Sequence, residues 1–180
     1  MNDVLQFKVG DKIVDYGQMY IIFKIKKDIL SNGEKEDCIY YRPYYKKDIN
    51  HSLVCSIPES SIEKANIRKP VSKKKIIRVL KLLGKKPNEV IRVNIRNVNL
   101  YFKYNDPIET ARLLKLLWLE KQEEDRNLST RKKAMYKNAM RSLVEEVSIV
   151  QMIDLKIAIK KICGRLKKIH PEKEGEENDK

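Results

Sequence analysis

The sequence predicts an α+β chain in which a small antiparallel β-barrel comes first and an all-helical domain follows. Two patterns support this fold class. Residues 12–58 contain short runs of β-branched and aromatic residues separated by turn signals, a spacing typical of small barrels. From Ser72 onward, apolar residues recur every three or four positions, as they do on one face of a helix. The 180 residues suffice for two such domains.

The strands are bounded by turn residues. Gly10-Asp11 and Gly17 enclose the first strand, and Ser31-Asn32-Gly33 is a hairpin signal because Asn and Gly tolerate positive φ. Prolines close the later strands, since proline cannot donate to a ladder. The strands are predicted at residues 12–14, 19–27, 38–42 and 52–58. Short strands this close together suit a Tudor-like or SH3-like barrel.

Tyrosines cluster in the second half of this barrel, at Tyr40, Tyr41, Tyr44 and Tyr45. They could form a stacking platform for single-stranded nucleic acid. The more frequent role is a half-buried strand residue with its hydroxyl at the rim, and the sequence leaves both readings open.

The helices are marked by capping signals. Ser72, Asp106 followed by Pro107, Ser129 and Asp154 are each typical N-caps, and Gly84 is a typical C-terminal residue. Trp118 is expected in the core. A further helix is expected within Val90–Tyr104, against its β-branched content. On the Ser129 helix we expect burial of Met135, Ala139, Leu143 and Val147.

The last helix carries an apolar stripe with two interpretations. It steps by three and four residues, so it could be a coiled-coil seam or could pack on the same bundle. The stripe consists of Met152, Leu155, Ile159, Ile162, Leu166 and Ile169.

Positive charge is concentrated in the second half of the chain. The formal net charge is +14, and residues 70–171 hold 25 Lys and Arg against 10 Asp and Glu. Residues 172–180 hold 2 against 5. We therefore divide the chain into a barrel at 1–69, a basic helical domain at 70–170 and an acidic tail at 171–180, expected to be disordered. Nucleic acid is the first partner to consider, because such a patch attracts polyanions. An anionic membrane or a merely solvated Lys-rich surface are the alternatives.

Catalytic chemistry is disfavoured by the residues present. The histidines His51 and His170 are isolated, and no phosphate-cradling or dinucleotide motif occurs. Glu145-Glu146 is expected to face solvent, as adjacent acids on a helix usually do. We expect no enzyme, no cofactor and no metal. The cysteines, Cys38, Cys55 and Cys163, are expected as reduced thiols of a cytoplasmic protein without membrane segments.

Several of these segments together resemble the CarD/CdnL family of bacterial transcription regulators. The resemblance rests on Phe7–Val14 with Gly17, on Ile57-Pro58, on Arg68–Ser72, and on Leu116-Leu117-Trp118, Leu128-Ser129, Met135 and Leu143–Glu146. In that family the N-terminal domain is Tudor-like and is shared with the transcription-repair coupling factor. The resemblance implies a monomer whose barrel docks on the RNA polymerase β subunit. Its helical domain would contact promoter DNA, largely without sequence specificity, at the upstream edge of the melted bubble.

The resemblance also assigns roles to residues. Lys27 and Ser56 fall on polymerase-contacting positions, Ser56 in place of an arginine. Ile91 falls where the family has a tryptophan wedge. It could itself serve as an apolar wedge in the minor groove, or it could be buried. The remaining DNA-binding candidates are basic: Arg92, Arg96, Arg131, Lys132, Lys133 and Lys137.

A second hypothesis comes from a different class. The chain could be a non-catalytic adaptor that binds RNA, a ribosomal surface or a partner helix through the barrel and the last helix, with the Met152–Ile169 stripe as a dimer seam.

Overall fold

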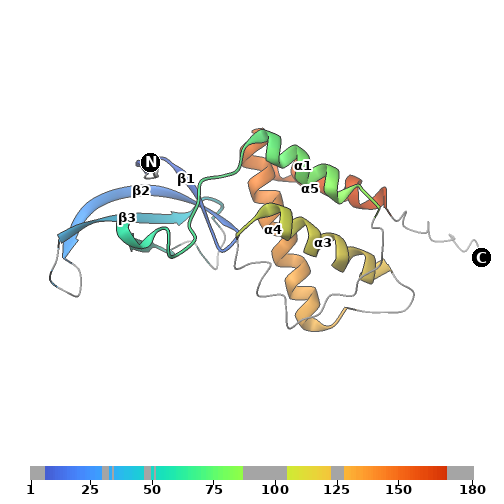
Figure 1. Ribbon diagram of the computed structural model, residues 1–180, viewed down its shortest axis with the longest axis horizontal. Helices are drawn as coiled ribbons and strands as arrows, with labels where there is room; N and C mark the ends of the chain where they lie inside the picture. The colour runs from blue at the N-terminus through green and yellow to red at the C-terminus, as the bar shows by residue number, and fades with distance from the viewer. Residues whose placement is uncertain are drawn as a thin grey trace, which may run out of the picture.

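A computed structural model describes residues 7–29, 33, 35–46, 50, 52–86, 105–122 and 128–169. The molecule is elongated, with a sheet at one end and a helical bundle at the other (Figure 1). This arrangement confirms the predicted α+β class with the strands first.

The strands form an antiparallel sheet in the order β1-β2-β3-β4. Their bounds are β1 Lys12–Asp15, β2 Gln18–Ile29, β3 Lys35–Pro43 and β4 Cys55–Pro58, so β4 begins three residues later than predicted. After β4 and the short 3-10 helix η2, Glu59–Ser61, the chain returns to the other side of the sheet, where Arg68 forms an antiparallel bridge with Val14 of β1. This bridge covers the edge of β1 that β2 leaves open.

The inner face of the sheet packs around its own apolar cluster. The alternation of β-strands places every second residue inward. The buried members are Phe7, Ile13, Tyr20, Ile22, Ile39, Tyr41, Ile62 and Ile67. A register shift between Ile22 and Lys24 displaces Phe23, and the side-chain alternation of β2 continues out of phase beyond it.

The helices are α1 Lys73–Leu83, α3 Pro107–Gln122, α4 Thr130–Gln151 and α5 Leu155–Lys167. All of the predicted N-caps are confirmed. The side chains of Ser72, Ser129 and Asp154 accept from the backbone N–H of Lys75, Lys132 and Lys156. Asp106 accepts from the N–H of Ile108 at 2.8 Å.

The helical core contains Trp118, which is 4% exposed, together with all the predicted buried residues of α4. On α5 the apolar stripe divides. Ile162, Leu166 and Ile169 are buried in the bundle, whereas Met152 and Ile159 are 85% and 43% exposed. Most of the stripe therefore packs on its own bundle, which removes the continuous seam that a dimer would need.

Some sequence predictions fall outside the described residues. These are the helix expected within Val90–Tyr104, the acidic tail, both histidines, and the candidate residues Ile91, Arg92 and Arg96. Within the described parts of the chain, no helix is both long and apolar enough to cross a bilayer. No disulfide joins Cys38, Cys55 or Cys163 to another of the described residues, and Cys38 is buried.

Candidate nucleic-acid interface

The sheet and the bundle are joined through a buried carboxylate on α4. The Glu146 side chain accepts two hydrogen bonds from the Arg68 guanidinium, at 2.6 and 2.9 Å, and one from the N–H of Val71 at 3.0 Å. Its neighbour Glu145 accepts from the N–H of Met19 at 3.2 Å. Both glutamates are buried, so the prediction that this pair faces solvent is wrong. That side of α4 is covered by β2 and by the segment leading into α1.

Asn105 forms the second part of this junction. Its amide nitrogen donates to the carbonyls of Val14 and Asn66, both at 3.0 Å, and its side-chain oxygen accepts from the N–H of Gly17 at 3.1 Å. The Asn105 carbonyl accepts from Arg68. One side chain immediately before α3 therefore satisfies backbone groups from three places in the barrel. Asn suits the position because its φ is 46°.

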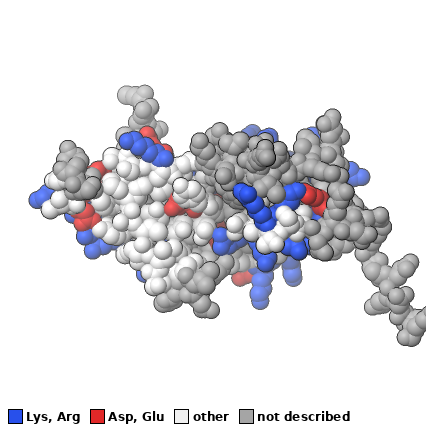
Figure 2. Space-filling view, turned by 90° about the horizontal axis from the view of Figure 1, so that it is seen from below, with Lys and Arg blue, Asp and Glu red and all other residues white. Residues whose placement is uncertain are grey.

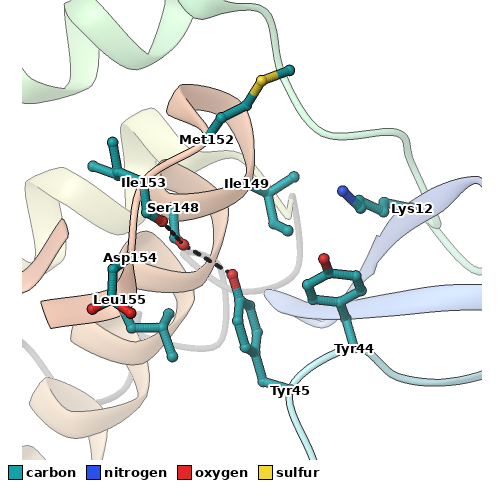
Figure 3. A pocket seen from close by; sticks show the side chains of 9 residues that line it. All are labelled: Lys12, Tyr44, Tyr45, Ser148, Ile149, Met152, Ile153, Asp154 and Leu155. Carbon is teal, nitrogen blue, oxygen red and sulfur yellow. Dashed lines mark hydrogen bonds between the residues drawn. The ribbon is translucent and has the colours of Figure 1, made fainter. Parts of the chain in front are cut away.

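A third contact lies beside a hollow of about 440 Å³ between β3 and the end of α4. The Tyr45 hydroxyl donates to Ser148 at 3.0 Å (Figure 3). Next to it, the Lys12 ammonium lies 4.9 Å from the centre of the Tyr44 ring. Tyr44 and Tyr45 thus belong to the junction.

The other tyrosines have separate places. The Tyr41 hydroxyl donates to Asp15 at 3.1 Å inside the barrel. Burial raises the pKa of the Asp15 carboxyl although this hydrogen bond acts in the opposite direction, and burial raises the pKa of Tyr20 to about 12. Tyr40 lies half-buried on the outer face of the sheet. Because they lie in different surroundings, the four clustered tyrosines do not form one stacking platform.

Basic side chains gather at the first turns of α4. Arg131, Lys133 and Lys137 are exposed there, and we name them the α4 basic face. Lys133 and Lys137 lie one turn apart on the same side of the helix. No acidic residue occurs in the first turn of α4. Figure 2 looks at the molecule from this end, and blue side chains gather around a small uncharged patch on its helical half.

Lys132 is placed differently from its neighbours. Its ammonium pairs with Glu120 of α3, and the exposed fractions of the two side chains are only 14% and 17%. The four basic candidates on α4 therefore separate into three exposed side chains and one that already has an anionic partner.

The two barrel candidates do not share a face of the sheet. Ser56 lies opposite Tyr40, whose side chain faces outward, and is exposed on β4 at the end of the strand order. Lys27 lies opposite Asp37 on β3. Strand alternation puts Asp37 on the same face as Ile39, the inner face, so Lys27 belongs to the inner face, near the end of β2 and beyond the buried core. A partner that contacts both residues must therefore extend around an edge or an end of the sheet.

An aromatic and basic cluster on the outer face was missed from the sequence. The ammonium groups of Lys24 and Lys26 lie 5.9 and 5.2 Å from the centre of the Tyr40 ring, and the Arg42 guanidinium lies 5.2 Å from that of Phe23. The Tyr40 hydroxyl also donates to Asp28. The cluster could not be recognised from the sequence because the irregularity at Phe23 interrupts the inward–outward alternation of side chains along β2.

The described residues contain no group of three or more His, Cys, Asp or Glu side chains that could hold a metal ion. Residues 75–162, from the first turn of α1 to the middle of α5, match the family described as CarD, C-terminal domain. The chain belongs to the CarD/CdnL family. It is accordingly a CarD-like transcription regulator, from a family of non-catalytic factors that interact with RNA polymerase.

The CarD match spans the helical bundle and the α4 basic face. No match to a curated protein was found.

Proposed function

We propose that this CarD-family chain docks its barrel on the RNA polymerase β subunit and contacts promoter DNA at the upstream edge of the bubble. In this proposal the protein acts as a monomer near the nucleoid and changes the stability of the open complex. No chemistry is required. A protein that binds the melted state more tightly than the closed one shifts the equilibrium between them by its difference in affinity.

The α4 basic face supports the DNA part of this proposal. The first N–H groups of a helix and its macrodipole attract anions, and at α4 exposed Arg131, Lys133 and Lys137 lie at the same end. Contacts of this kind bind phosphates and carry little sequence information. Lys132 would have to exchange Glu120 for a phosphate before it could contribute. Ile91, Arg92 and Arg96 are proposed to complete the surface.

The single observation that carries the proposal is the junction around Glu146. Barrel and bundle have separate apolar clusters, and we place the boundary between the domains near residue 69. Hydrogen bonds from Arg68, Val71 and Met19 to Glu145 and Glu146 hold the two in one orientation. A docked barrel would therefore hold the α4 basic face at a fixed position relative to the polymerase.

The test is the half-life of an open complex formed by bacterial RNA polymerase on a promoter fragment, with and without the protein, over a salt series. We expect the protein to lengthen the half-life, and the gain to fall as salt rises because phosphate contacts release counterions. The double substitution Lys133→Ala and Lys137→Ala should remove most of the gain, while the affinity for the isolated β subunit stays within about twofold.

The matched control is Lys73→Ala with Lys74→Ala. It removes the same charge from the exposed first turn of α1, which lies on the opposite side of the bundle from the start of α4 (Figure 1). This variant should behave as the wild type. Equal loss in both double variants would mean that overall charge matters and that the α4 basic face does not.

The docking part is tested separately at Ser56. Ser56→Arg introduces, on exposed β4, the side chain that the family carries at this position. A hydrogen bond to a charged group typically contributes about 1.5–3 kcal/mol, so we expect roughly tenfold tighter binding to the isolated β subunit in a titration without DNA. Asn138→Arg, on exposed α4, adds the same charge elsewhere and should leave this affinity unchanged. An unchanged affinity for Ser56→Arg would argue against docking through β4.

A further inference from the structure

Helices α1 and α5 pack side by side and carry basic side chains without a single acidic one. The basic residues of α1 are Lys73, Lys74, Lys75, Arg78 and Lys81, and those of α5 are Lys156, Lys160, Lys161, Arg165 and Lys167. Like charges at this density repel one another and destabilise the folded state unless anions lie nearby.

A groove of about 500 Å³ lies between these two helices. Its charged lining consists of Lys81, Lys160, Lys161, Arg165 and Lys168, all of them exposed, and none of the described carboxylates lines it. The space beside Gly164 is open, because a Cβ built on this residue would meet no atom within 4 Å. We name these five cations with Gly164 the α1–α5 groove.

The hydrogen bond between Lys161 and Gln151 inside the groove does not balance this charge. The Lys161 ammonium donates to the Gln151 side-chain oxygen at 2.8 Å, and an amide is neutral. The floor contributes apolar surface from Ile77, which is 48% exposed. Such a groove suits an acidic peptide segment, because carboxylates can pair with the cations while the methylene groups of glutamate side chains contact the apolar surface.

The groove and the α4 basic face lie at opposite ends of α4. Gln151 lines the groove at the last residue of α4, whereas Arg131 and Lys133 lie in its first turn. At 1.5 Å per residue, the two sites are about 30 Å apart along the helix. The cations of the α1–α5 groove are therefore a separate set from those of the α4 basic face.

The chain supplies a suitable segment directly after α5. Residues 171–180 contain five carboxylates, Glu172, Glu174, Glu176, Glu177 and Asp179, against two lysines. They follow closely after Ile169, which is buried beside the last turn of α5. An extended segment of this length spans roughly 30 Å, more than the distance back along α5 to Lys160. Direct linkage also gives it an effective concentration on the order of millimolar.

We propose that the acidic segment 171–180 binds back onto the α1–α5 groove of its own chain. The carboxylates pair with the groove cations, so these cations are not available to bind nucleic acid. The α4 basic face then remains the principal surface for DNA. The proposal does not depend on polymerase docking, since it is tested on the full chain alone.

The test is cross-linking with a carbodiimide, which joins a carboxylate to a lysine only at contact distance, followed by peptide mass spectrometry. In the wild type we expect Lys81 to be joined to glutamates of residues 171–180. Lys160→Glu with Lys161→Glu keeps Lys81 but reverses the charge beside it, and should lower this cross-link at least fivefold. Lys133→Glu with Lys137→Glu makes the same change of charge on the α4 basic face and should leave it within twofold.

Three cross-linking results would overturn the proposal. One is the absence of the Lys81 cross-link in the wild type, and another is an equal yield in both double variants. The third is a cross-link found only between isotope-labelled and unlabelled copies, which would assign the segment to a second chain. Acetylation of Lys160 distinguishes DNA as the occupant. In the wild type without DNA we expect Lys160 to be protected from acetylation. The triple variant Glu172→Gln with Glu174→Gln and Glu176→Gln should lose this protection. Protection of Lys160 that requires an added duplex would also overturn the proposal.

Discussion

Glu146 is the residue on which the relative position of barrel and bundle depends most. Its carboxylate is almost fully buried and Arg68 is only 22% exposed, so removal of one partner leaves a charge without compensation. We expect Glu146→Ala to lower the free energy of unfolding by about 3 kcal/mol. Urea denaturation measures this loss. Glu109→Ala breaks the Glu109–Arg112 pair on the surface of α3 and should cost less than about 1 kcal/mol. Equal losses would contradict the role given to burial.

Asp15 makes stability depend on pH in the direction opposite to that of most carboxylates. Burial raises its pKa above the ordinary value of 3.8, so the folded state binds more protons than the unfolded state between these two values. The free energy of unfolding therefore falls as pH rises through this window. Asp15→Asn removes the titration, and its Oδ1 can still accept from Tyr41.

The measurement for Asp15 is urea denaturation of both proteins at about pH 4 and about pH 7. The stability of Asp15→Asn relative to the wild type should increase between the two values. A difference that stays constant would mean that ionised Asp15 is not penalised by its surroundings.

At the scale of elements, the turn between β1 and β2 approaches α4 closely at Gly17. A Cβ on Gly17 would lie 2.8 Å from the Ser142 hydroxyl oxygen, and its φ is +74°. Gly10 has a similar φ of +93° but open space around it. We expect Gly10→Ala to cost about 1 kcal/mol through its backbone and Gly17→Ala to cost at least about 1 kcal/mol more through the contact. Thermal unfolding of the two variants measures this difference, and equal costs would mean that the Ser142 side chain or α4 moves aside.

The elements that the sequence predicts well are those decided by local contacts. Ser72, Ser129 and Asp154 cap their helices through atoms two or three residues away, so the signal and its partner lie in the same stretch of sequence. The roles of Glu145 and Glu146 depend on Met19 and Arg68, far away in sequence, and no local pattern contains that information. The outer-face cluster was missed for a different reason, since the irregularity at Phe23 hides the alternation. In the candidate site, the periodicity that predicts burial of Met135 and Ala139 is compatible with exposed Lys133 and Lys137, whereas no local pattern indicates the pairing of Lys132 with Glu120.

At the scale of the whole molecule, the proposed function requires a fixed orientation of the barrel relative to the α4 basic face. Asn105→Gly would remove the amide that joins Val14, Asn66 and Gly17, while a glycine still accepts a φ of 46°. We expect the affinities for the isolated β subunit and for a DNA duplex to stay within about twofold, and the gain in open-complex half-life to fall severalfold.

The matched control for Asn105→Gly is Asn66→Gly. It makes the same chemical change at another positive φ, 57°, and keeps the carbonyl that accepts from Asn105. It should retain most of the gain in half-life. If Asn105→Gly retained the full gain as well, the orientation of the bundle would not depend on this amide.

Arg68 belongs to the barrel and to the bundle at once. Its backbone exchanges hydrogen bonds with Val14 at the edge of the sheet, and its side chain holds Glu146 on α4. Fraying of that edge would release the carboxylate, and release of the carboxylate would free the edge. The two halves should therefore melt in one cooperative transition, and the backbone amides of Val14 and Arg68 should exchange with deuterium only when the whole chain unfolds.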